Sequence, residues 1–151
     1  MSKRVLIVEA RFYADIADMM FDAAADVLKK SAIQFDRISL PGSFELAPAI
    51  AMAAQTGKYD GYLALGCVIK GETNHFELVC NEAARAIQNL SVERQLPIGF
   101  GLITAYNDEQ AWARARVDGE NYGGRAAAAC LRMMELKAGF QAPSAKLKVS
   151  N

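Results

Sequence analysis

The chain of 151 residues has one histidine, one tryptophan, four prolines and three cysteines. Cys67, Cys80 and Cys130 are odd in number, widely spaced and set in apolar stretches. Disulfide frameworks and zinc sites need paired or clustered Cys and His residues. We therefore expect neither a disulfide framework nor a metal site, and a reducing, cytoplasmic location fits best.

The chain also lacks an excess of charge of either sign and any long apolar run. Seventeen basic and seventeen acidic residues give a net charge of zero, with no basic block. Nucleic acid is a poor candidate for a partner, because binding its phosphates needs concentrated positive charge. No stretch approaches the length of a membrane span, and the first residues lack the apolar segment of a signal peptide. The composition predicts a globular protein with neither nucleic-acid nor membrane partners, and zero net charge does little to oppose self-association.

What is present is an alternation of apolar runs and helical repeats. Strands are predicted at residues 5–8, 35–40, 62–69 and 98–104, and helices at about 15–30, 45–55, 76–90, 109–115 and 124–138. This order is typical of an α/β fold with a parallel sheet covered by helices on both faces. We expect one domain over residues 1–140 and a loose tail at 141–151.

The single histidine, His75, lies in the most informative segment, residues 65–76. This segment is typical of an apolar strand, a glycine-bracketed turn and the first turn of a helix. Such a turn leaves backbone N–H groups unpaired at the positive end of a helix dipole, where phosphate binds readily. An imidazole beside that site can move protons near neutral pH. The competing interpretation is an incidental histidine on the surface or in the core.

Other candidate residues also follow predicted strands, and ligands bind at the carboxyl ends of strands in open parallel sheets. Phe12 and Phe44 either stack on a flat heterocycle or fold back over the core. Glu45 complements a helix dipole, and that role does not exclude a second one as acceptor of hydrogen bonds from ligand hydroxyls. Gly66 and Gly71 would let backbone amides approach a ligand closely.

Two further residue types leave alternatives open. Arg114 or Arg116 could complete a phosphate site, although their arrangement alone favours a solvated helix face. Cys67 lies near the suspected site, but a small buried hydrophobe is the favoured interpretation over a nucleophile. The residues alone support an enzyme or binder for a phosphorylated small molecule with an aromatic ring in reach, and no particular reaction.

Several motifs follow one another along the chain: Arg11-Phe12, residues 41–46, 65–76, 79–84, 97–101 and 109–111, and Arg114-Ala115. In this collinear order they resemble the lumazine synthase family of riboflavin biosynthesis. The resemblance spans about residues 4–140 and implies a flavodoxin-like, three-layer αβα sandwich around a four-stranded parallel sheet. It implies a transferase without cofactors that condenses 5-amino-6-(D-ribitylamino)uracil with 3,4-dihydroxy-2-butanone 4-phosphate to 6,7-dimethyl-8-ribityllumazine. The departures from the family pattern are Tyr13, Lys70 and Tyr122.

The resemblance also implies a role for each candidate residue. His75 would donate and accept protons, and Phe12 would stack on the pyrimidine ring. The remaining substrate-binding residues would be Ser43, Phe44 and Glu45 for the ribityl chain, Cys67, Val68 and Ile69 for the pyrimidine edge, Glu72, Thr73 and Arg114 for the phosphate, and Phe100 from a neighbouring subunit.

The family forms homopentamers or multiples of them, with sites at subunit interfaces. The alternative is a paralogue that binds flavin or lumazine and has lost the reaction. A flavodoxin-like electron carrier fits poorly, because the loop after the first strand lacks a run of Ser and Thr donors.

Overall fold

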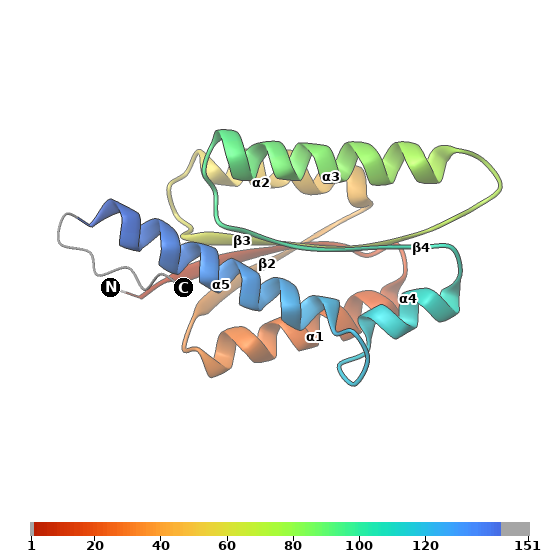
Figure 1. Cartoon of the computed structure of the whole chain (residues 1–151), viewed down its shortest axis with the longest axis horizontal. Coiled ribbons are helices and arrows are strands. Elements are labelled where there is room, and N and C mark those ends of the chain that lie inside the picture. The colour runs from red at the N-terminus through yellow and green to blue at the C-terminus, as the bar shows by residue number, and fades with distance from the viewer. Residues whose placement is uncertain (1, 143–151) are drawn as a thin grey trace, which may run out of the picture.

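A computed structural model of the protein describes residues 2–142, which form one parallel sheet between two layers of helices (Figure 1). The elements are β1 (Arg4–Ala10), α1 (Ala14–Lys30), β2 (Gln34–Leu40), the 3-10 turn η1 (Ser43–Glu45), α2 (Leu46–Ala54), β3 (Gly61–Ile69), α3 (His75–Glu93), β4 (Ile98–Ala105), α4 (Asp108–Ala115) and α5 (Tyr122–Gln141). The strand order is β2-β1-β3-β4, and each neighbouring pair is parallel. The predicted α/β sandwich is confirmed.

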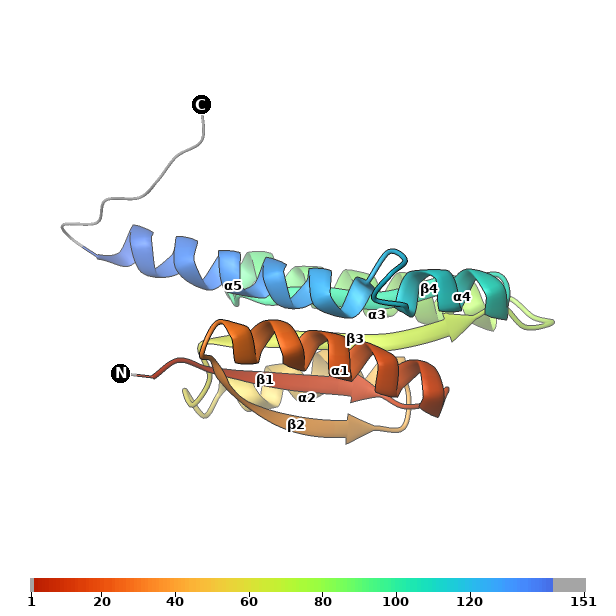
Figure 2. The ribbon, with the colours of Figure 1, turned by 90° about the horizontal axis from the view of Figure 1, so that it is seen from below.

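The two helical layers cover opposite faces of the sheet. Helices α2 and α3 lie on one face, and α1, α4 and α5 lie on the other, as Figures 1 and 2 show from two directions. Each connection between two strands therefore crosses one face of the sheet and returns the chain to the end of the sheet where the strands begin. The carboxyl ends of all the strands point toward the same end of the molecule, which is where the candidate residues were expected.

The side chains of strand β1 pack into the core on both faces of the sheet. Val5 and Ile7 pack into a cluster under α1 and α5, while Leu6 and Val8 pack into a second cluster under α2 and α3. All four side chains are fully buried. Burying a side chain of this size stabilises a fold by roughly 1.5–3 kcal/mol. The apolar run therefore reads correctly as a strand buried on both faces.

Each helix begins within two residues of its expected start, and local chemistry explains two of these starts. The helix expected from Glu45 begins at Leu46 after the 3-10 turn, with Pro48 in its first turn, where its missing N–H is tolerated. Helix α5 begins at Tyr122, because the Asn121 side chain accepts a hydrogen bond from the Gly124 amide at 3.2 Å and caps the helix.

The last described helix continues through Gln141, so the first residue of the predicted tail is helical. Residues 143–151, the rest of that predicted tail, lie outside the described residues. Within residues 2–142, no helix has both the length and the apolar character needed to span a bilayer.

Candidate active site

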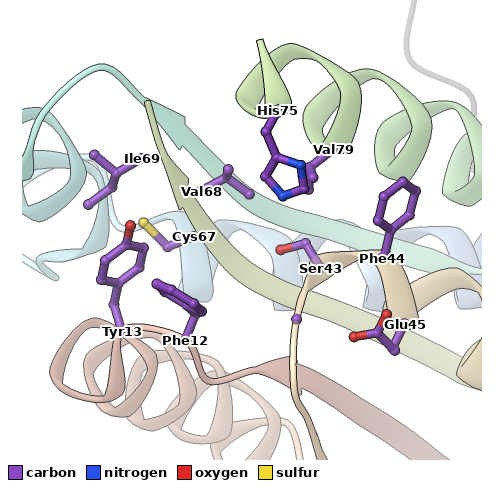
Figure 3. Close-up of a pocket in the computed structure, with 11 residues that line it drawn as sticks. Phe12, Tyr13, Ser43, Phe44, Glu45, Cys67, Val68, Ile69, His75 and Val79 are labelled. Atoms are coloured by element: carbon purple, nitrogen blue, oxygen red, sulfur yellow. The ribbon is translucent and has the colours of Figure 1, made fainter. Parts of the chain in front are cut away.

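A cavity of about 300 Å³ opens at the carboxyl ends of the strands, between the loops that follow β1, β2 and β3. Figure 3 shows its side chains converging from these loops and from the start of α3. The residues that line it are Phe12, Tyr13, Gly42, Ser43, Phe44, Glu45, Cys67, Val68, Ile69, His75 and Val79.

Eight of the predicted site residues therefore lie around one cavity, although they come from segments as far apart as residues 12 and 75. The parallel topology causes this, because it places the ends of β1, β2 and β3 side by side. Tyr13, Gly42 and Val79 also line the cavity and were not predicted. Tyr13 directly follows Phe12 and Val79 lies one helical turn after His75, so both could have been found from those neighbours.

His75 is the first residue of α3, and its ring points into the cavity (Figure 3). Its backbone N–H donates to the Thr73 hydroxyl at 3.3 Å. Within residues 2–142, the amides of Gly71, Glu72 and Thr73 find no acceptor. Unpaired amides at the start of a 19-residue helix are suited to an anion.

Two glycines expected to allow close approach differ in their surroundings. A Cβ at Gly66 would lie 3.0 Å from Leu102 Cδ1 and 3.1 Å from Ser43 Oγ. The missing side chain therefore makes room for buried Ser43 at the wall of the cavity. At Gly71 a Cβ would meet open space, so no neighbouring atom of the described residues requires a glycine there, and the close approach of a ligand to its backbone stays a prediction.

The loop aromatics do not fold back over the core. Phe12 is 74% exposed, and its ring meets Tyr13 edge-on with 4.9 Å between ring centroids. Phe44 is 44% exposed and also faces the cavity (Figure 3). Large exposed aromatic surface in a cavity favours the interpretation as a ligand contact.

The surroundings of Glu45 and Cys67 bear on their two possible roles. The Glu45 side chain makes no capping hydrogen bond to α2, so its carboxylate oxygens remain available to ligand hydroxyls. Burial raises the pKa of the Cys67 thiol from 9.0 to about 12. A thiol in that state is protonated near neutral pH and is a poor nucleophile, as expected of a small buried hydrophobe. Burial also raises the pKa of the neighbouring Tyr13.

Four predicted residues do not line the cavity formed by residues 2–142. Glu72 and Thr73 lie in the exposed loop before α3. Arg114 lies in the last turn of α4, where it donates to the Gln110 carbonyl at 3.0 Å and its Nε lies 3.7 Å from Glu120 Oε2. Phe100 is 47% exposed on β4, beside a separate hollow against α5.

The described part of the chain has no cluster of side chains that could bind a metal ion. Residues 2–142 contain no group of three or more His, Cys, Asp or Glu side chains placed to hold a metal ion. The polar groups that line the cavity are the His75 imidazole, the Glu45 carboxylate and the hydroxyls of Ser43 and Tyr13, and the loop amides lie nearby.

The fold and the cavity define an α/β protein whose site, at the carboxyl edge of a parallel sheet, suits a small molecule with a flat ring, hydroxyl groups and an anionic end. Comparison with known proteins is more specific. Residues 2–138 match the family model described as 6,7-dimethyl-8-ribityllumazine synthase. The chain belongs to the 6,7-dimethyl-8-ribityllumazine synthase family, which confirms the resemblance seen in its motifs.

Individual relatives cover nearly the whole chain. A 6,7-dimethyl-8-ribityllumazine synthase of Bartonella tribocorum is 51% identical over 137 residues, which are 90% of this chain and 91% of the relative. The enzyme of that name from Agrobacterium fabrum is 50% identical over 143 residues, 91% and 97% of the two chains. A Rhizobium meliloti protein named 6,7-dimethyl-8-ribityllumazine synthase 1 is 51% identical over 138 residues, 88% and 90% of the two chains.

Proposed function

We propose that this chain condenses 5-amino-6-(D-ribitylamino)uracil with 3,4-dihydroxy-2-butanone 4-phosphate to give 6,7-dimethyl-8-ribityllumazine. The observation that carries the proposal is the single cavity uniting Phe12, Ser43, Glu45, Cys67 and His75. The family and the names of the relatives supply the reaction. None of these relatives supports the alternative of a carrier that binds without turnover.

The pyrimidine substrate would lie against the inner part of the cavity. Phe12 offers an exposed ring face for stacking, and the backbone of residues 67–69 lies across the cavity from it (Figure 3). Glu45 would accept hydrogen bonds from the ribityl hydroxyls, with Ser43 and Phe44 completing that wall. The pocket thus combines apolar stacking with a few polar groups that fix orientation.

The phosphate of the second substrate would lie at the outer loop. Free amides at Gly71, Glu72 and Thr73 and the positive end of α3 favour an anion there. Arg114 would supply the cation, because a guanidinium binds phosphate through two parallel hydrogen bonds. Its contact with Glu120 is 3.7 Å long and partly exposed, so a phosphate can compete for it.

His75 would move the protons. The primary amine of the pyrimidine attacks the ketone and forms an imine with loss of water. Phosphate then leaves, and ring closure expels a second water. Each step needs a proton delivered or removed, and imidazole does both near neutral pH. Holding the two substrates side by side also makes the first step effectively intramolecular, which can supply the larger part of the acceleration.

We further propose that the chain works as a homopentamer, or a multiple of one, with Phe100 reaching the ring bound in a neighbouring subunit. Exposed Phe100 lies on an edge strand and outside its own chain's cavity, which supports a role toward another subunit. A cytoplasmic location is supported by three buried cysteines that remain free thiols.

An absorbance assay tests the reaction. The protein mixed with both substrates should form lumazine faster than the substrates alone, and omitting either substrate should abolish the signal. A rate equal to the protein-free control would refute the proposed activity. Sedimentation tests the assembly, since a species at the 16.4 kDa of one chain would contradict shared sites.

A further inference from the structure

Glu9 is a buried carboxylate that no step of the proposed reaction uses. It lies near the end of β1 and is 1% exposed. Its Oε1 accepts from Arg11 Nη1 at 2.9 Å and from Arg37 Nη2 at 3.2 Å. Its Oε2 accepts from Arg37 Nε and from the Ser39 hydroxyl, the latter at 3.2 Å. A buried carboxylate with this many donors holds its partners firmly, because each lost hydrogen bond removes part of what stabilises a charge buried away from water.

The partner Arg11 is the residue immediately before Phe12. Its second terminal nitrogen, Nη2, donates to Asp18 Oδ1 on α1 at 2.7 Å. Its backbone N–H donates to the Leu40 carbonyl at 3.2 Å, just beyond the end of β1. The Asp18 and Glu9 carboxylates raise the pKa of Arg11, so the guanidinium stays charged between them. The chain is therefore pinned by backbone and side chain directly before it reaches the cavity.

Phe12 itself has few contacts of its own. Its ring is 74% exposed and meets Tyr13 edge-on. A side chain this exposed is placed by the backbone on either side of it, and on one side that backbone is held by Arg11. We propose that Glu9 is a positioning residue that sets the Phe12 ring for stacking on the pyrimidine, acting through Arg11. This inference rests on the proposed stacking role of Phe12.

The competing interpretation is that Glu9 only ties β1 to β2. The chain offers a matched control for it at the other end of the same two strands. Asp36 on β2 accepts from Arg4 Nη1 on β1 at 2.8 Å, and neither residue lines the cavity. Asp36→Asn therefore removes a charge pair between the same strands without touching the segment that leads to Phe12.

The test is calorimetric titration of the full chain with 5-amino-6-(D-ribitylamino)uracil. Glu9→Gln turns one acceptor into a donor facing two guanidiniums, and we expect it to raise Kd about three- to tenfold, the range of an aromatic stacking contact. In a Phe12→Ala background, Glu9→Gln should change Kd by less than about twofold, because residues that act through one another are not additive. Asp36→Asn should leave Kd unchanged while lowering the melting temperature.

Three results would overturn the inference: an unchanged Kd in folded Glu9→Gln, an equal Kd increase with and without Phe12, or the same increase in Asp36→Asn. If Glu9→Gln does not fold, Asp18→Asn replaces it, since Asp18 is exposed and holds the other side of Arg11. A Kd unchanged in that variant would also reject the inference. Wild-type protein that binds the pyrimidine but forms no lumazine would refute the proposed activity alone, and leave the Kd comparison valid.

Discussion

Replacing His75 with alanine should lower turnover while the fold of the protein stays intact. The side chain is exposed at the first position of α3, and no hydrogen bond joins its ring to residues 2–142. Surface substitutions of this kind change the free energy of unfolding by no more than about 0.5 kcal/mol. The unpaired amides of the neighbouring loop belong to the backbone and remain in place. Folding, assembly and phosphate binding should therefore survive.

The loss should fall on turnover. General acid–base catalysis typically raises a rate by about 10²–10⁴-fold. Because His75 is exposed, water can reach the reacting atoms and replace part of its proton transfer. We therefore expect kcat to fall by about 10²-fold, the lower end of that range. The KM for each substrate should stay within about threefold, because the ring binds neither substrate strongly in the ground state. His75→Gln is the matched control, since it keeps a hydrogen-bonding side chain but cannot shuttle a proton. Initial rates of lumazine absorbance at saturating substrates give the answer. A kcat within threefold of wild type in both variants would refute the assigned role.

Three further predictions concern the phosphate cation and the thiols. Arg114→Ala should raise the KM for the butanone phosphate about 10- to 100-fold through loss of a charged hydrogen bond, while Arg116→Ala should not; equal effects of the two would contradict the assignment. Cys67→Ala should keep kcat within about threefold, since the protonated thiol takes no part in the chemistry, and an inactive but folded variant would reverse that conclusion. Burial raises the pKa of both Cys67 and Cys130 from 9.0 to about 12, so the unfolded chain loses these protons at lower pH than the folded chain. The free energy of unfolding should then fall above pH 9 by up to about 1.4 kcal/mol per pH unit for each thiol, as urea titrations can show, and replacing both cysteines with alanine should flatten the slope.

The sequence predicted the sheet well because its strands carry unambiguous patterns. Residues 5–8 are apolar on both faces and could only be a buried strand, and Pro97 marks the approach to β4. The ends of the helices follow less directly from the sequence, because capping and turn geometry decide them. The 3-10 turn at residues 43–45 and the start of α5 at Tyr122 depend on local hydrogen bonds that hydrophobic periodicity does not report.

The residues of the cavity could be predicted where they directly follow a strand. The rule for parallel sheets placed Phe12, Glu45 and His75 together, and the structure does the same. Tyr13 was missed because a tyrosine in a loop carries no signal of its own. The Glu9 cluster was missed for another reason: a charged residue inside a strand gives no hint of which donors the register will bring to it.

The central claim is that this cavity joins two substrates and expels phosphate. The most direct measurement is the simultaneous appearance of lumazine, by absorbance, and inorganic phosphate when wild-type protein is mixed with both substrates. The account predicts that the two products form together in equal amounts, at a rate proportional to protein concentration. Phosphate released without lumazine, or neither product above the protein-free rate, would contradict it.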